Sequence, residues 1–387
     1  MSGAAGNSAQ ALMARAIQLA ERGLYTTMPN PRVGCVITDD TGQIVGEGWH
    51  QRAGLPHAEI EALANAGERA RGATVYVTLE PCSHTGRTGP CADALIEAGV
   101  ARVVFGMQDP NPSVSGEGLQ KLRDAGIEVE GPLLEERCRA LNPGFIKRMS
   151  LGLPLVRCKS AMSLDGRTAM ASGESKWVTG PAARADVQRL RARSCAIVTG
   201  VETVRFDNPN LNVRADEMAL ELLTSEQAAQ AVAIQEVQPL RVIVDSKLRT
   251  PAKAFILQGD APTLVCTTEQ AEPSRRERLE SAGAEVLVLP ADKEGRVDLQ
   301  ALLEELARRQ CNEVLVESGA TLSGEFLYRG HVDELIVYVA PKLLGSTARP
   351  LFELPIERMG SVLPITITDM RAVGHDWRIT ATTDIER

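Results

Sequence analysis

The sequence has few aromatic residues, no long apolar run and no excess of positive charge. Aromatic side chains make up 3% of the chain, so neither an extensive base-stacking surface nor an aromatic membrane belt is expected. No apolar stretch approaches the roughly 20 residues that a membrane span needs. Lysine and arginine number 42 against 50 acidic residues, a net charge of −8, which disfavours binding to a nucleic-acid backbone. We therefore expect no membrane and no nucleic-acid partner.

The first residues also lack the order of a secretion signal, in which a basic segment precedes an apolar one. We therefore expect a cytoplasmic protein. In a reducing compartment the eight cysteines are expected to be core residues, metal ligands or nucleophiles rather than disulfide partners.

The chain has 387 residues, of which 44% are apolar and 24% charged, a balance typical of folded proteins with more than one domain. Helix and strand patterns alternate on both sides of residue 150, which predicts an α/β fold in two domains, 1–149 and 150–387. The boundary is placed in the breaker-rich stretch 147–154. Residues 216–238 carry five acidic and no basic residues. They are interpreted as a helical insertion without an assigned function.

The strongest local motif lies in the first domain, where His57 is followed by Cys82 and Cys91. One imidazole and two thiolates suit zinc, and three protein ligands leave a fourth position for water, as in catalytic sites. Pro56 and Pro90 each precede a ligand at the start of a helical pattern. Both ligands are therefore expected at helix N-termini, where the helix dipole favours anions.

Glu59 stands two residues after His57 and is expected to move protons between water, the attacked ring and the departing amine. The arrangement is that of zinc-dependent deaminases acting on nucleobases. The cysteines are separated by eight residues instead of two, and this loop carries His84 and Arg87, which could hold a substrate phosphate. The alternative is a helix-capping histidine and buried structural cysteines. Cys35 is the one nearby rival ligand, and its apolar strand pattern favours a core role.

The second domain contains neither a G-x-G-x-x-G nor a P-loop motif. It does contain a strand at 313–317 followed by the turn Ser318–Gly324 and a helix. Backbone N–H groups at such a helix start can hold the pyrophosphate of a cofactor. Glu317, at the strand end, lies where α/β sheets bind ligands. Arg191 and Arg214 suit a phosphate, although solvated surface charges are the alternative for both.

Several runs of residues resemble the bifunctional deaminase/reductase of riboflavin biosynthesis. These runs are Met28–Cys35, Gly54–Glu59, Thr78–His84, Asp109–Pro112, Ser163–Thr168 and Ser172–Trp177. The resemblance spans about residues 10–385, with one departure at Gly89, where that family usually has proline. It implies a cytidine-deaminase-like αβα domain followed by a dihydrofolate-reductase-like α/β domain.

The resemblance further implies zinc-dependent deamination of 2,5-diamino-6-(5-phosphoribosylamino)pyrimidin-4-one. NADPH-dependent reduction of the product's ribose to a ribityl chain would follow, in a homo-oligomer joined through the reductase domain. By match to the family, the expected cofactor contacts are Ala161, Trp177, Thr203, Asp207, Ser246, Gly319, Ala320, Thr321, Leu322, Ser323, Gly324 and Glu325. The expected substrate contacts are Asn30, His50, His84, Arg87, Ser175, Arg191, Leu211, Arg214 and Glu317. For Trp177, core packing is the alternative.

Two other functions remain open on the sequence. One is an RNA-editing deaminase with an unrelated C-terminal region, which the net charge of −8 and the few aromatics disfavour. The other is a zinc-stabilised binding protein without turnover, which the presence of Glu59 disfavours.

Overall fold

The computed structural model describes residues 8–83, 89–112, 114–175, 177–219, 224–225, 228, 238–259 and 261–383. The chain divides into two compact units, residues 1–152 and 153–387. The stretch expected to hold the boundary is helical as far as Leu151, because helix α6 (Pro143–Leu151) runs through it and ends at Gly152 in the left-handed conformation.

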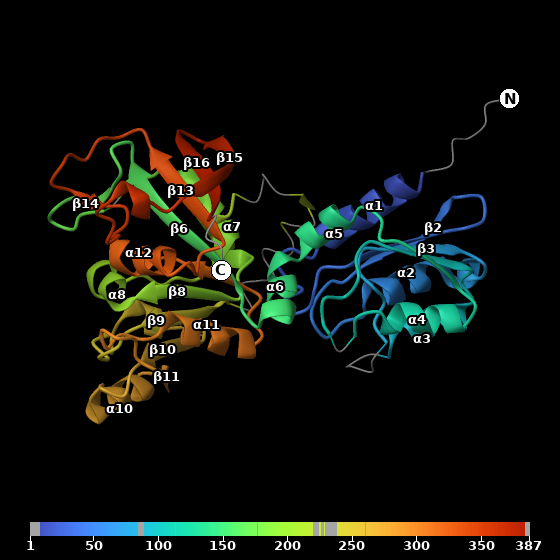
Figure 1. Ribbon diagram of the computed structural model, residues 1–387, viewed down its shortest axis with the longest axis horizontal. Coiled ribbons are helices and arrows are strands. Elements are labelled where there is room, and N and C mark those ends of the chain that lie inside the picture. The colour runs from blue at the N-terminus through green and yellow to red at the C-terminus, as the bar shows by residue number, and fades with distance from the viewer. Residues whose placement is uncertain are drawn as a thin grey trace. The chain divides into compact units, whose positions relative to one another are not determined.

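The first unit is a five-stranded sheet between two layers of helices (Figure 1). The strand order is β2-β1-β3-β4-β5, with β1 antiparallel to β2 and β3, and with β3, β4 and β5 parallel. Helices α1 and α5 lie on one face, and α2, α3 and α4 on the other. The αβα prediction is confirmed. The elements are α1 (Ala9–Glu21), β1 (Gly34–Thr38), β2 (Ile44–Trp49), α2 (Ala58–Ala66), β3 (Thr74–Val77), α3 (Cys91–Ala98), β4 (Arg102–Phe105), α4 (Glu117–Asp124), β5 (Glu128–Glu130) and α5 (Glu135–Leu141).

Glycines in β2 allow α2 to approach the sheet closely. A Cβ atom at Gly48 would lie 2.3 Å from the backbone oxygen of Ala58, and one at Gly46 would lie 2.3 Å from that of Ala62. Neither contact is possible for a residue with a side chain. The start of α2, which carries His57, is therefore held against the sheet.

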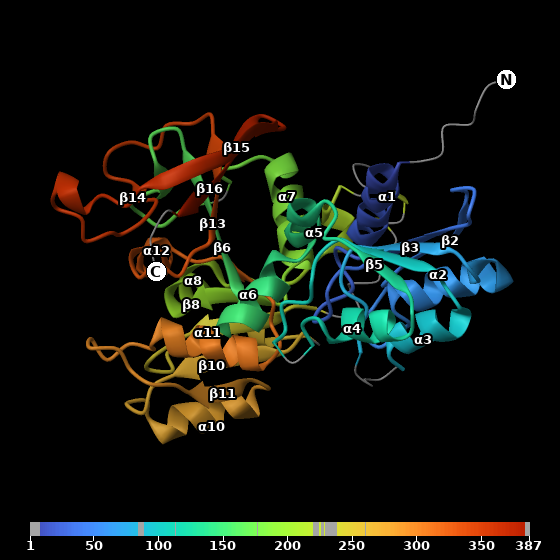
Figure 2. The same cartoon turned by 45° about the vertical axis from the view of Figure 1, so that its right-hand side comes forward.

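The second unit is built on a nine-stranded sheet of order β11-β10-β9-β8-β12-β6-β13-β16-β15, which can be followed from bottom to top in Figure 2. The strands from β11 to β13 are parallel, and β16 and β15 add antiparallel to β13. The α/β prediction is confirmed here too. The strands of the large sheet are β6 (Leu155–Ser163), β8 (Ala196–Gly200), β9 (Leu240–Val244), β10 (Thr263–Thr267), β11 (Glu285–Val288), β12 (Glu313–Val316), β13 (Glu334–Ala340), β15 (Ile365–Val373) and β16 (Asp376–Thr383).

Central strands such as β12 are fully buried, as is usual for parallel strands with helices on both sides. The helices of this unit are α7 (Pro181–Ala192), α8 (Val201–Asp207), α10 (Pro273–Ser281), α11 (Leu299–Arg308) and α12 (Ala320–Tyr328), and a separate pair of short strands is formed by β7 (Arg167–Ala169) and β14 (Arg349–Pro350).

The expected helical insertion at 216–238 lies mostly outside the described residues. What is described there includes a single 3₁₀ turn at Ala215–Glu217. Within the described parts of the chain, the helices are all too short or too polar to cross a membrane.

Candidate functional site

The three predicted zinc ligands converge in the first unit. His57 precedes the first residue of α2, Cys91 is the first residue of α3, and Cys82 lies in the loop after β3. The ligand atoms of all three lie within 4.8 Å of one another. His57 Nδ1 is 3.2 Å from Cys91 Sγ and 3.6 Å from Cys82 Sγ. Tetrahedral zinc with bonds of about 2.0 Å to nitrogen and about 2.3 Å to sulfur separates such atoms by about 3.6 Å, so the donor set fits zinc.

The electrostatics of the cluster favour a thiolate at Cys82. The backbone N–H of Cys91 donates to Cys82 Sγ at 3.3 Å. Hydrogen bonding from Cys91, together with His57, lowers the pKa of Cys82 to about 4. The hydrogen bond to Cys82 in turn raises the pKa of His57. The thiolate is the form of cysteine that binds zinc.

Glu59 lies in the first turn of α2 and is 3% exposed. Burial and the neighbouring charge of Cys82 raise its pKa to about 7. A carboxyl group with such a pKa can both accept and donate a proton near neutrality. Glu59 does not belong to the cluster of possible metal ligands among the described residues, which leaves it available for proton transfer.

Asn30 and His50, predicted as substrate contacts, lie together beside the metal ligands. His50 Nδ1 is 3.0 Å from the Pro56 carbonyl oxygen, so it carries the proton and donates. The other ring nitrogen, Nε2, then accepts from Asn30 Nδ2 at 3.1 Å. Burial lowers the pKa of His50, which favours this neutral form. The His50 and His57 rings meet edge to face with centroids 5.4 Å apart. Predicted contacts His84 and Arg87 lie outside the described residues.

Glu80, which was not among the predicted residues, fixes the loop that carries Cys82. Its carboxylate is buried and accepts from the backbone N–H groups of Asp109, Gly116 and Gly118 at 3.2, 3.0 and 3.1 Å. These donors satisfy a buried charge that would otherwise be costly. The signal in the sequence was an acidic residue directly before Pro81 and Cys82 in an otherwise apolar strand end.

Replacing Cys91 with alanine is expected to abolish stoichiometric zinc binding, because the remaining two ligands cannot complete the site. The measurement is the zinc content of the purified protein by elemental analysis. Cys35→Ala is the matched control, since Cys35 is equally buried but lies outside the cluster. Zinc loss in the Cys35 variant, or zinc retention in the Cys91 variant, would contradict the assignment.

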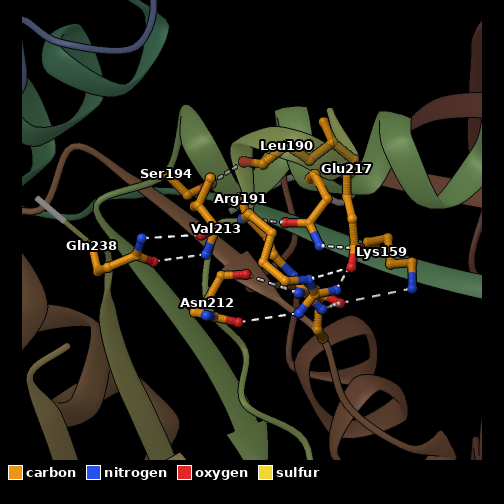
Figure 3. A network of polar contacts seen from close by, with 11 residues as sticks. Lys159, Leu190, Arg191, Ser194, Asn212, Val213, Glu217 and Gln238 are labelled. Atoms are coloured by element: carbon orange, nitrogen blue, oxygen red, sulfur yellow. Dashed lines mark hydrogen bonds and ion pairs between the residues drawn. The ribbon is translucent and has the colours of Figure 1, made fainter. Parts of the chain in front are cut away.

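In the second unit, buried Glu317 forms a charged group with Arg191 and Lys159, whose side chains are 12% and 20% exposed (Figure 3). Glu317 follows β12 and accepts from Arg191 Nε at 2.6 Å and from Arg191 Nη2 at 3.0 Å. Lys159, on β6, places Nζ 3.8 Å from Glu317 Oε2. Burial opposes ionisation of Glu317, but Arg191 and Lys159 hold its pKa below the ordinary value. Burial also lowers the pKa of Lys159, and the charge of Arg191 adds to this effect.

Lys159 was not among the predicted residues. The signal that could have found it is a lysine between the buried residues Cys158 and Ser160 of an apolar strand. Lys159 lies at the middle of β6. It directly follows the last residue that pairs with β12, which places it at the carboxyl end of β12, where sheets of this kind bind ligands.

The structure joins several of the remaining predicted residues. The backbone N–H of Gly319, which caps α12, donates to Thr203 Oγ1 at 3.2 Å. Ser175 Oγ lies 3.5 Å from Asp207 Oδ1. The first contact joins the start of α12 to α8, and the second joins the segment before α7 to the end of α8. The rest of the predicted turn, Ala320–Glu325, forms the first part of α12.

Other predicted residues make different contacts. Trp177 is 65% exposed, so core packing is excluded, and the guanidinium of Arg184 lies 4.4 Å from its ring centroid. Ser246 accepts from the backbone N–H of Val297 at 3.0 Å. Ala161 lies on β6. Leu211 is buried and has a positive φ of 49°. It directly precedes Asn212, which accepts hydrogen bonds from both Arg191 and Arg214.

Comparisons with known proteins agree with this arrangement. Residues 7–107 match the cytidine and deoxycytidylate deaminase zinc-binding region, and residues 154–379 match the RibD C-terminal domain. The riboflavin biosynthesis protein RibD of Escherichia coli K12 is 51% identical over 367 residues, covering 94% of this chain and 96% of that protein.

Solved structures give the same result. Acinetobacter baumannii RibD, form 2, superposes with a TM-score of 0.86 at 46% identity, covering 97% of this chain and 98% of the other. The Thermotoga maritima structure described as a diaminohydroxyphosphoribosylaminopyrimidine deaminase/5-amino-6-(5-phosphoribosylamino)uracil reductase gives 0.80 at 33% identity, with the same coverage. With a zinc-type deaminase unit and a reductase unit in this order, the chain belongs to the RibD family of bifunctional deaminases and reductases in riboflavin biosynthesis.

Proposed function

We propose that the chain first deaminates 2,5-diamino-6-(5-phosphoribosylamino)pyrimidin-4(3H)-one and then reduces the product, 5-amino-6-(5-phosphoribosylamino)uracil, with NADPH. The observation that carries the first step is the cluster of His57, Cys82 and Cys91 with buried Glu59 beside it. The substrate identity is supported by the description of the Thermotoga maritima relative.

In the deaminase unit, His57, Cys82 and Cys91 would hold zinc, which when bound supplies the Lewis acid that makes water nucleophilic near neutral pH. Glu59 accepts one proton of the attacking water and gives it to the ring nitrogen, and then carries the second proton of that water from the new hydroxyl group to the departing amine. Asn30 and neutral His50 present fixed polar atoms beside the ligands, which suits them to orient the pyrimidine.

In the reductase unit, NADPH when bound supplies the hydride. The predicted cofactor residues on β6, α8 and the start of α12 would align it. Lys159 and Glu317 offer a buried proton donor and acceptor pair for the oxygen of the open-chain sugar. Arg191 is paired with Glu317 and its side chain is only 12% exposed. Arg214, with its side chain 37% exposed, is therefore the arginine assigned to the substrate phosphate.

The test supplies the diaminopyrimidine phosphoribosyl compound with NADPH and follows ammonia and the nicotinamide absorbance together. One ammonia released and one NADPH consumed per substrate are expected, with ammonia appearing first. NADPH consumption without prior ammonia release, or deamination of RNA in preference to this compound, would contradict the proposal.

Replacing Arg214 with alanine is expected to raise the reductase KM about tenfold, because a charge-assisted hydrogen bond to the phosphate is lost. Deamination should change little, since Arg214 belongs to the second unit. The two rates are measured separately, with Arg276→Ala as control, because Arg276 is an exposed arginine paired on α10. An equal loss of both activities would show that the assignment is wrong.

A cytoplasmic homo-oligomer joined through the reductase unit completes the proposal. Strand β15 is the last strand of the large sheet, and Ile365, Ile367 and Met370 on it are exposed. An exposed apolar edge strand of this kind favours association. Sedimentation of the purified protein measures the oligomer.

A further inference from the structure

Two arginine–glutamate pairs of the same bidentate geometry are neighbours in the reductase unit (Figure 3). Arg191 donates to Glu317 at 2.6 and 3.0 Å, and Arg214 donates from Nε and Nη2 to Glu217 at 2.6 and 2.7 Å. Asn212 connects them, because its backbone oxygen accepts from Arg191 and its side-chain oxygen from Arg214, both at 3.1 Å. The pairs therefore belong to one network.

The two pairs differ in burial. The side chains of Arg191 and Glu317 are 12% and 8% exposed, whereas those of Arg214 and Glu217 are 37% and 45% exposed. Separating the first pair would leave two charges in a medium of low dielectric, which is costly. Water screens the second pair and can solvate each partner when they part. Only the Arg214–Glu217 pair can therefore exchange partners readily.

The backbone around Arg214 is fixed independently of its side chain. Gln188 is buried, and its Oε1 accepts from the backbone N–H of Arg214 at 3.1 Å while its Nε2 donates to Glu217 at 3.2 Å. The side chain of Gln238 pairs with both backbone groups of Val213, at 2.7 and 3.1 Å. An exchange at Arg214 thus leaves the backbone in place, but it moves the Glu217 side chain and breaks its hydrogen bond from Gln188.

We infer that Glu217 is an internal competitor for the phosphate of the reductase substrate. This rests on the proposed function, in which Arg214 contacts that phosphate. A carboxylate and a phosphate each present two oxygens to the Nε/Nη2 edge of a guanidinium, so both fit the same face. Binding the phosphorylated substrate exchanges the Glu217 carboxylate for the phosphate. A ligand without a phosphate cannot make this exchange, so Glu217 contributes to specificity for phosphorylated compounds.

The test replaces Glu217 with glutamine, which keeps the shape and removes the charge. We expect the reductase KM to fall about two- to fivefold, the range that the strength of a half-exposed ion pair allows. The inhibition constant of inorganic phosphate, used as a competitive probe, should fall by a similar factor, with kcat changing less than KM. Glu280→Gln is the matched control, because Glu280 forms an exposed ion pair with Arg276 on α10, and its KM should stay at the parent value.

Introducing Glu217→Gln into the Arg214→Ala variant completes the design. In this double variant the fall in KM should disappear, because the guanidinium for which the Glu217 carboxylate and the phosphate compete is gone. A raised KM in Glu217→Gln would mean that the carboxylate orients Arg214 for the substrate. An unchanged KM and inhibition constant would mean that the carboxylate neither orients Arg214 nor competes with phosphate. Either result would overturn the inference. If Arg214→Ala alone leaves KM unchanged, the phosphate assignment fails as well, so the two failures are distinguishable.

Discussion

Glu59→Gln should lower the rate of ammonia release by about 10²- to 10⁴-fold while zinc content stays the same. The range is that of a lost general acid–base group. Burial and the neighbouring charge of Cys82 raise the pKa of Glu59 to about 7. Glutamine fills the same space but cannot accept or donate the proton. The measurements are the rate of ammonia release at saturating substrate and, separately, the zinc content by elemental analysis.

Glu61→Gln is the control for this variant. Glu61 lies in the same first turn of α2 and outside the cluster of possible ligands, so both rate and zinc content should match the parent protein. Deamination that persists in Glu59→Gln would refute the proton-transfer role. Loss of zinc together with activity would instead make Glu59 a ligand.

Glu313→Ala should lower the free energy of unfolding of the second unit by about 3–5 kcal/mol, the usual cost of breaking a buried ion pair from one side. The Glu313 side chain is 1% exposed and pairs with Arg157 and, at 3.3 Å, with Arg193. Without it, the buried Arg157 loses one of its acidic partners and retains Glu334. The change in the free energy of unfolding is measured by urea titration, with hydrogen exchange of residues 153–387 reporting on the second unit.

An exposed pair in the same unit provides the comparison. Glu280→Ala, which breaks the pair with Arg276 on α10, should cost about 1 kcal/mol or less. Equal effects of the two variants would show that burial does not decide the strength of these pairs. A loss of less than about 1 kcal/mol in Glu313→Ala would contradict the argument from burial.

The zinc centre was predictable because its signals are local. Two ligands stand at helix starts preceded by proline, and the residue types themselves select the metal. The loop around Glu80 was not predicted, because its carboxylate accepts from backbone groups 29 to 38 residues away. Such donors carry no side-chain signature in the sequence.

Some elements of the fold have little signal in the sequence, for an equally physical reason. Helix α10 has only Leu279 buried, so it lacks the apolar period that identifies a helix. Strand β15 is exposed along most of its length and shows no alternation toward a core. Helix α6 occupies a stretch whose breakers, Gly152 and Pro154, follow its end instead of interrupting it.

By itself the sequence determined the alternation of helices and strands, the α/β class of both units and the identity of the metal-binding side chains. Only the tertiary structure decided which charged residues meet. Lys159, Arg191 and Glu317 come from β6, α7 and the end of β12, and the sheet order brings them together. It also decided that Arg191 has a permanent partner and Arg214 an exchangeable one. Periodicity and motifs encode local conformation, whereas the burial of a charge depends on every element packed around it.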